Sequence, residues 1–454
     1  MISTPSRVAR RLAAVGLAAT AVVIAGCDRP EPPAGYVCRD CNVVLISMDT
    51  LRADHVGAYG YDRPTTPVVD ELAARAVLFE NAISQSSWTR PAHMSMFTGL
   101  YPAEHGYLAL VNRRPLADTV PTLASVLRDR GYATVAFTGG INMAPAFGFD
   151  SGFDLYRVNG RYYRNSIEEA RYWLDEIDKK GAERFFMFFH AYDPHTPYHS
   201  DPIAREALGL AKAPPGKGYR RACKNERAGP RIRRYIDEYD AAIRSGDRYV
   251  GKLIEHLDSL GLLDRTLIVF TSDHGEEFLE HGRCFHLSTL YREVLHVPLM
   301  IVAPAGPVGR IESLVPASVS IGPTILDLVG GTDHTLPGPS LAGFLGGVPP
   351  HFEHVQSETS RREYEGRGEG HVRALTGEHE KIIEWVSRGE RLYYDLGTDP
   401  GELSPIESGR ARDRMYEALA QWVGRHPPRK VHGAANPEDS SELDRQLRSL
   451  GYQD

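Results

Sequence analysis

The sequence predicts an α/β protein with a mostly parallel central sheet and helices on both faces. Three continuous apolar runs are typical of strands buried on both faces: NVVLISMDT (42–50), RFFMFFHAYDPH (184–195) and RTLIVFTSDHGE (265–276). Helical spacing appears at 66–77 and 234–266, and 120–139 predicts a helix, a glycine stop and a further strand. This alternation of strand and helix favours parallel pairing.

The character of the chain changes after the Pro/Gly-rich stretch LPGPSLAGFLGGVPP. Between 354 and 396 the segments are shorter and polar, with strand-like alternation, and they predict a small antiparallel α+β subdomain. A helix from about Asp413 to Val423 is expected to follow. We therefore expect a large domain at 42–345, a C-terminal subdomain at 346–425 and a charged, loosely attached tail at 426–454. A chain of 454 residues is long enough for this arrangement.

The first 26 residues have the anatomy of an export signal. A basic start precedes an apolar run from Leu12 to Ala25, which is too short to span a bilayer comfortably. IAGC (24–27) resembles a bacterial lipobox, which implies cleavage before Cys27 and lipid attachment to its thiol. The Pro-rich 27–41 is then a tether, and we expect a membrane-anchored lipoprotein of the periplasm or cell envelope. The alternative is a plain secretory signal.

Four cysteines remain once Cys27 is assigned to the lipid: Cys38, Cys41, Cys223 and Cys284. An even number outside the cytoplasm predicts disulfides, with three possible connectivities. Cys38 and Cys41 have CxxC spacing without a second pair at metal spacing. This favours a local structural disulfide over redox or zinc chemistry.

The charge balance bears on the class of partner. The formal net charge of −7 and pI near 6.2 argue against a nucleic-acid partner, because phosphate backbones are bound by clustered Lys and Arg. The short basic run at 218–234 is diluted by Glu and Gly and predicts a solvated loop or lid.

Residues suited to ester chemistry fall at or just after the ends of the expected strands. They are Asp49, Thr89, His93, His195, Asp273, His274 and His286. Open α/β sheets place ligands at the carboxyl ends of their strands. Together these residues offer two carboxylates and an imidazole for a divalent cation, a hydroxyl to attack, and further imidazoles to bind an anion or shuttle protons.

The sequence resembles the sulfatase family of the alkaline phosphatase superfamily from Asn42 to about Glu402. The matching stretches are NVVLISMDTLRADHVGAYGY, TTPVVDELAARAVLFENAISQSSWTRPAHMSMFTGLYPAEHG, FFHAYDPHTPY, YDAAIRSGDRYVGKLIEHLDSLGLLDRTLIVFTSDHGE, LYREVLHVPLMI and LYYDLGTDPGE. The resemblance implies an alkaline-phosphatase-like α/β sandwich with a metal site at the carboxyl ends of the strands.

Carried over residue by residue, the resemblance assigns roles to the same side chains. Asp49, Asp273 and His274 match metal ligands, Thr89 the nucleophile, His93 the basic residue four positions later, and His195 a substrate-binding histidine. His286 lies near a late Lys or His, with a one-residue ambiguity. His281 and His105 are expected to be supporting or structural.

Three departures separate this chain from typical sulfatases. The C-x-P-S-R signature, whose Cys or Ser becomes formylglycine, here reads TRPAH (89–93), so formylglycine is not expected. Thr50 replaces the second Asp of a metal-binding pair, and GGIN (139–142) replaces a lysine-containing GKWH region. Because an unmodified hydroxyl forms a phosphoenzyme that water can displace, threonine suits phosphoryl transfer better than sulfate cleavage.

Thr89 is expected to be activated by direct coordination to one divalent ion, which is Ca, Mg, Mn or Zn on ligand type. A two-zinc site using Asp193, His195 and His199 is the alternative. The helix dipole would assist a nucleophile at the start of a helix. The alternative is that Thr89 has the purely structural role of a helix N-cap. His286 or His195 is expected to protonate the leaving alcohol.

Three functions remain open at this point. The first is a metal-dependent hydrolase, possibly a transferase, acting through Thr89 on phosphate mono- or diesters of small molecules, glycans or lipids. The second is a sulfuric ester hydrolase with a non-standard T-x-P-x-H site. The third is a catalytically silent binding or scaffold protein. Residues that select the substrate are expected at 200–233 and in the C-terminal subdomain.

Overall fold

The computed structural model describes residues 35–108, 114–181, 184–210, 229–331, 333–360 and 370–432. The expected signal peptide, Cys27, Cys223 and most of the expected tail lie outside the described residues. None of the helices in the described ranges is both long and apolar enough to cross a membrane.

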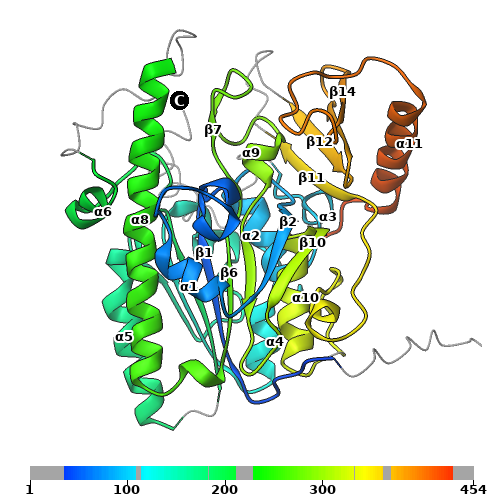
Figure 1. Ribbon diagram of the computed structural model, residues 1–454. Coiled ribbons are helices and arrows are strands. Elements are labelled where there is room, and N and C mark those ends of the chain that lie inside the picture. Colours follow the sequence, from blue (N-terminus) through cyan, green and yellow to red (C-terminus); the bar gives the residue numbers. More distant parts are fainter. Residues whose placement is uncertain are drawn as a thin grey trace, which may run out of the picture.

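The centre of the molecule is an eight-stranded sheet (Figure 1). In sheet order the strands are β10 (Gly309–Pro316), β2 (Val77–Ile83), β9 (Leu299–Val302), β6 (Thr266–Thr271), β1 (Asn42–Met48), β5 (Phe185–Ala191), β3 (Ala133–Thr138) and β4 (Leu155–Val158). Only β9 runs antiparallel to its neighbours, so the predicted mostly parallel sheet is confirmed. In the paired registers Ser47 of β1 lies beside His190 of β5 and Thr271 of β6, and these three strands therefore end at the same edge.

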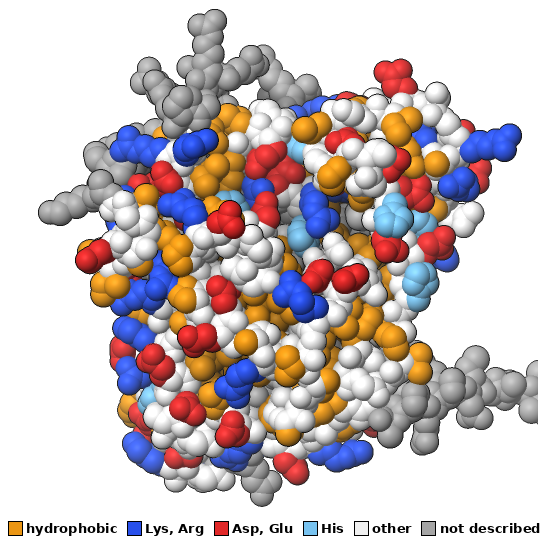
Figure 2. All heavy atoms as spheres, in the orientation of Figure 1, with side chains coloured by type: hydrophobic (Ala, Val, Ile, Leu, Met, Phe, Trp, Pro, Cys, Tyr) orange, Lys and Arg blue, Asp and Glu red, His pale blue; other side chains and the backbone are white. Residues whose placement is uncertain are grey.

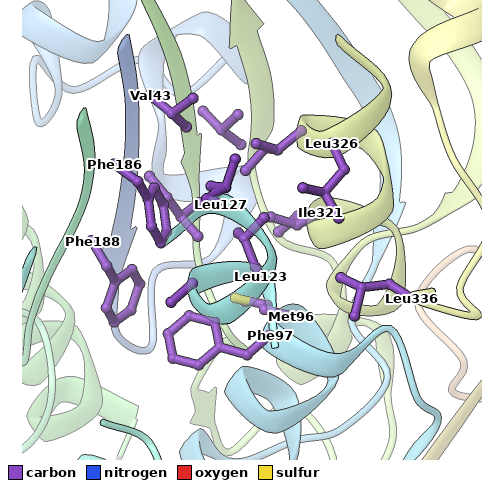
Figure 3. Close-up of a cluster of buried hydrophobic side chains, with 14 of the residues drawn as sticks. Val43, Met96, Phe97, Leu123, Leu127, Phe186, Phe188, Ile321, Leu326 and Leu336 are labelled. Carbon is purple, nitrogen blue, oxygen red and sulfur yellow. The ribbon is translucent and has the colours of Figure 1, made fainter. Parts of the chain in front are cut away.

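Helices cover both faces of this sheet, as predicted. One face carries α1 (Pro67–Ala73), α5 (Tyr163–Lys179) and α8 (Gly229–Ser259), and the other carries α2 (Thr89–Thr98), α4 (Leu123–Asp129) and α10 (Ser318–Leu328). The central strands are apolar throughout because both of their faces are covered. Figure 3 shows Val43 and Phe186 of the sheet beside Leu127, Ile321 and Leu326 of the second helical layer.

Two expected helices have different bounds in the structure. The helix expected at 66–77 ends at Ala73, because the apolar residues from Val77 onward form β2. The helix expected from 234 begins at Gly229, and Gly261 follows its end with a left-handed backbone (φ 65°), as a helix stop requires. Short helices α3 (Pro102–His105), α6 (Pro202–Ala207) and α9 (Arg292–Leu295) and a two-stranded hairpin, β7 (Glu277–Phe278) with β8 (Cys284–Phe285), complete the large domain.

The predicted C-terminal antiparallel sheet is also confirmed. It consists of β11 (Val355–Ser360), β12 (His371–Thr376), β13 (Glu380–Trp385) and β14 (Glu390–Asp395), with α11 (Arg410–Arg425) packed on one face. The other face packs on the large domain. At this junction the buried Lys381 Nζ donates to Glu402 Oε1 over 2.7 Å, and Glu402 Oε2 accepts from the backbone N–H of Arg292.

The start of the expected tail is attached rather than loose. Arg429 forms an ion pair with Glu104 at 2.7 Å, and the buried Val431 accepts a backbone hydrogen bond from Ala117. Cys38 and Cys41 form the expected local disulfide, and Cys284 is also disulfide-bonded. On the face drawn in Figure 2, acidic and basic side chains are interspersed.

Candidate active site

Asp49, Asp273 and His274 come together at the shared edge of the sheet. Asp49 follows β1, and the other two follow the neighbouring parallel strand β6. His274 Nε2 lies 3.4 Å from Asp273 Oδ2 and 3.9 Å from Asp49 Oδ1, and all three side chains are fully buried. The topology therefore gathers the three side chains that the sequence singled out as metal ligands.

The atoms of this group that face one another have no hydrogen-bond partner among the described residues. They are Asp49 Oδ1, Asp273 Oδ2 and His274 Nε2. The remaining atoms are used: Asp273 Oδ1 accepts from the N–H groups of Thr50 and His274, and His274 Nδ1 donates to the carbonyl of Gly275. That last bond leaves the lone pair of Nε2 available, which is the tautomer a metal ligand needs.

The electrostatics of the group also fit a cation. Burial, and then the neighbouring charge of Asp273, raise the pKa of Asp49 well above its ordinary value. Buried unpaired polar atoms are rare and costly in folded proteins, and two carboxylates beside an imidazole are common ligands of divalent metals. The residues present therefore fit one divalent metal ion.

Thr89 is placed against this group by α2, of which it is the first residue. Its Oγ1 donates to Asp49 Oδ2 over 3.1 Å. The helix N-cap is Trp88, not Thr89, so the interpretation of Thr89 as a capping residue is wrong. The hydroxyl faces a carboxylate of the candidate metal group instead of a backbone N–H of its own helix.

His93 lies one helical turn after Thr89 and supports it. Its Nδ1 is 2.9 Å from the carbonyl of Thr89, so Nδ1 donates and Nε2 accepts from the hydroxyl of Ser47 at 2.9 Å. Burial lowers the pKa of His93 to about 3, so the ring is neutral. His93 thus holds the backbone of the candidate nucleophile in place.

His286 and His195 continue the site away from the metal group. The ring centroid of His286 is 4.4 Å from that of His274 and 5.1 Å from that of His195, which stacks on Tyr192. Phe285 and Leu287 on either side of His286 have φ of 74° and 88°, a conformation that costs energy for such residues and is concentrated at functional sites. His286 is thus a histidine of this stretch whose ring contacts His274.

Two buried residues of the site escaped the sequence analysis. Glu276 Oε1 lies 3.1 Å from His286 Nδ1, and burial raises the pKa of Glu276 to about 8. His190 Nε2 lies 3.6 Å from Asp49 Oδ2, and neither of its ring nitrogens has a hydrogen-bond partner among the described residues. His190 is a polar residue near the carboxyl end of the apolar strand β5, which is a usable signal, whereas Glu276 follows the end of β6 and has no such signal. His105 and His281 were expected to be supporting or structural residues. His105 forms a hydrogen bond with Ser95, and His281 forms one with Glu293.

The residues of the alternative two-zinc site do not form a metal group in the described part of the chain. Asp193 Oδ2 instead accepts from the N–H of Tyr163 at the start of α5, and His199 contacts Arg164. A second group, His93 with His190 and Asp273, has ligand atoms close together, but both ring nitrogens of His93 are already hydrogen-bonded. The geometry therefore favours a single ion.

The glycines at 139 and 140 have a steric reason. A Cβ on Gly140 would lie 1.9 Å from Cε2 of Tyr192, and its φ of 77° is left-handed. The Tyr192 ring therefore fills the space in which a side chain at this position would begin. Thr50 also has a left-handed backbone (φ 61°), and its N–H donates to Oδ1 of Asp273.

The fold and the site together define a metal-dependent hydrolase of the alkaline phosphatase superfamily. The family model described as Sulfatase matches residues 41–331. The chain belongs to the sulfatase family.

Individual relatives agree with this assignment. Arylsulfatase K of Xenopus laevis is 24% identical over 438 residues, which span 83% of this chain and 80% of that protein. A solved 2-O GAG sulfatase has a TM-score of 0.71 at 20% identity, covering 88% of this chain and 99% of that one. The phosphonate monoester hydrolase of Agrobacterium radiobacter has a TM-score of 0.68 at 20% identity, covering 85% and 96%. These two structures show that the fold is shared.

Proposed function

We propose that this protein is an exported hydrolase of phosphate mono- or diesters that uses Thr89 as its nucleophile. The observation that carries the proposal is the 3.1 Å hydrogen bond from Thr89 Oγ1 to Asp49 Oδ2, beside three unpartnered atoms suited to a metal. A hydroxyl held against a buried metal ligand is well placed to attack an ester that binds at the same point.

The chemistry of threonine supports phosphate over sulfate. Thr89 Oγ1 forms a bond to phosphorus, the bond from phosphorus to the leaving alcohol breaks, and the threonine proton passes to Asp49 Oδ2. The imidazolium form of His286 or His195 gives its proton to the leaving oxygen, which departs as the alcohol. Water then attacks the phosphothreonine and the bond from Thr89 Oγ1 to phosphorus breaks. One proton of the water returns to the imidazole, and the proton held by Asp49 returns to Thr89 Oγ1. Formylglycine has no part in this sequence because threonine lacks the chemistry to form it.

Asp49, Asp273, His274 and Thr89 would hold the metal ion. When bound there, a divalent ion would lower the pKa of the Thr89 hydroxyl and neutralise charge on the ester oxygens. The set combines oxygen and nitrogen donors and has four members, whereas Ca²⁺ takes six to eight oxygens. This composition supports Zn²⁺ or Mn²⁺ over Ca²⁺.

A paired ester assay tests the proposal. Purified protein supplied with Zn²⁺ or Mn²⁺ is expected to hydrolyse bis(p-nitrophenyl) phosphate with a higher kcat/KM than p-nitrophenyl sulfate. Faster cleavage of the sulfate would favour a sulfuric ester hydrolase, the activity for which the curated relatives are named. Turnover of neither ester, with no metal retained after purification, would favour a catalytically silent binding protein.

Glu276 is expected to act by orienting His286. Glu276→Leu removes the group bonded to Nδ1 of His286, and kcat should fall by about 10- to 100-fold with little change in KM, as when other supporting partners of site histidines are removed. Glu276→Gln keeps an acceptor at the same place and should retain most of the rate.

The adjacent Glu277 provides a matched control. It is equally buried and faces Thr289, so Glu277→Leu should leave kcat unchanged in protein that remains folded by circular dichroism. If Glu276→Gln were as slow as Glu276→Leu, positioning through this hydrogen bond would be excluded.

A further inference from the structure

Two arginines without carboxylate partners lie at the rim of the site, next to His195. Arg161 follows β4, and Arg164 is in the first turn of α5. Neither guanidinium has an ion pair in the part of the chain that the structure describes. This is unusual for the neighbourhood, because most arginines of the same strand and helix are paired: Arg157 pairs with Glu169 and Arg171 with Glu168.

Arg161 is connected directly to the candidate active site. Its Nη2 donates to the carbonyl of Thr196 at 3.0 Å and lies 3.2 Å from His195 Nδ1. Its guanidinium carbon is 5.5 Å from the ring centroid of Tyr192, and its Nε is buried without a partner. The carbonyl of Thr196 and the ring of Tyr192 thus position the guanidinium group of Arg161, while its Nε–H donor has no hydrogen-bond partner among the described residues.

Arg164 extends the same positive surface outward. It contacts Nε2 of His199, and its guanidinium carbon lies 4.9 Å from the ring centroid of Tyr162, which also packs on His199. Arg164 is exposed, while Tyr162 and His199 are partly buried. The side chains of Arg164, Tyr162 and His199 are therefore positioned by contacts with one another and not by an ion pair with Asp or Glu.

The nearby carboxylates are engaged elsewhere. Asp193 is buried and accepts the N–H of Tyr163, and Asp201 pairs with Arg248 and accepts the N–H of Ala204 in α6. Neither arginine forms an ion pair with these carboxylates among the described residues, although the charge of Arg164 opposes the rise in the pKa of Asp193 that burial causes. Donors of both guanidinium groups are therefore available to a group that the protein does not itself supply. A guanidinium binds carboxylate, sulfate and phosphate oxygens through paired donors.

We propose that Arg161, Arg164 and His199 form an anion-binding subsite. This subsite binds a second negatively charged group of the substrate, which is separate from the ester that Thr89 attacks. The chain of contacts from Arg161 through His195 and His286 to His274 sets this separation. The substrate class is therefore an ester that carries a further phosphate, sulfate or carboxylate. This inference rests on the proposed function and specifies its substrate.

Two matched substrates test the subsite: p-nitrophenyl phenyl phosphate and p-nitrophenyl 3-carboxyphenyl phosphate, which differ by one carboxylate. The wild type is expected to prefer the carboxylated ester by about tenfold in kcat/KM at low salt, with the preference falling as salt rises. In the double variant Arg161→Met/Arg164→Met the preference should drop to near unity. Arg164→Met alone should lower the preference and keep the rate on the ester without the carboxylate within about twofold.

A matched control removes two charges from the same strand and helix. Arg157→Met/Arg171→Met lacks two paired arginines and should keep the wild-type preference. A wild type without preference for the carboxylated ester would overturn the proposal. So would an equal loss of rate on both esters in Arg161→Met/Arg164→Met, since that result would assign the arginines to the reacting centre.

Binding without turnover separates the subsite from the proposed function. In a Thr89→Ala background, calorimetric titration should show 3-carboxyphenyl phosphate binding more tightly than phenyl phosphate, and the difference should vanish when Arg161 and Arg164 are also replaced. If neither ester is hydrolysed by the wild type, the proposed function fails, and this titration still decides the subsite. Equal affinities for the two ligands would exclude it.

Discussion

Replacing Thr89 with valine is expected to lower kcat/KM for the preferred ester by at least about a thousandfold, because it removes the only atom proposed to bond to phosphorus. Valine keeps the branched shape at the start of α2, where every residue is buried, so the helix should stay in place. Thr89→Ser keeps a hydroxyl within reach of Asp49 Oδ2 and should retain activity within about a hundredfold of the wild type. Steady-state kinetics on the three proteins measures the difference.

The covalent step can be examined separately from the rate. Acid quenching of wild-type protein during turnover, followed by peptide mass spectrometry, should find phosphate on the peptide containing Thr89. Thr89→Val should show none. A Thr89→Val variant that keeps more than a tenth of the wild-type rate would contradict the assignment, and water or another side chain would then be the nucleophile.

The sequence predicts the frame of the fold because burial on two faces leaves a clear pattern. In β1, β5 and β6 nearly every residue is apolar, and each run is followed by a helix or a functional turn. The antiparallel strand β9 was not anticipated, since its four residues look the same in either direction. Its direction is set by pairing with β2 and β6, which are far away in the sequence.

The sequence predicts those site residues that come together because they follow neighbouring strands of the sheet. Asp49, Asp273 and His274 follow neighbouring parallel strands, so their convergence follows from the sheet order. Glu276 and His190 were missed because their roles depend on distances across the site, to His286 and Asp49. No local pattern encodes such a distance. The N-cap interpretation of Thr89 failed for the same reason, since a side chain 40 residues away accepts its hydrogen bond.

Removing the metal is expected to destabilise the protein as well as to stop turnover. Asp49 Oδ1, Asp273 Oδ2 and His274 Nε2 gain partners only when an ion binds, and the unfolded chain has no such site. A ligand at a concentration of 100 times its Kd stabilises the native state by about 2.7 kcal/mol, so chelation should lower the midpoint of thermal unfolding. Adding Zn²⁺ or Mn²⁺ back should restore it.

Matched carboxylate variants decide whether that response comes from this site. Asp273→Asn removes a negative ligand that also bonds Thr50, and its thermal midpoint should no longer depend on added metal. Asp247 is equally buried but accepts the N–H groups of Val68 and Val69 in the first turn of α1, so Asp247→Asn should respond to chelator as the wild type does. A full metal response in Asp273→Asn would place the ion elsewhere. It would also leave the unpartnered atoms at the sheet edge without an explanation, because burial of two carboxylates together is unfavourable unless a cation or a proton compensates them.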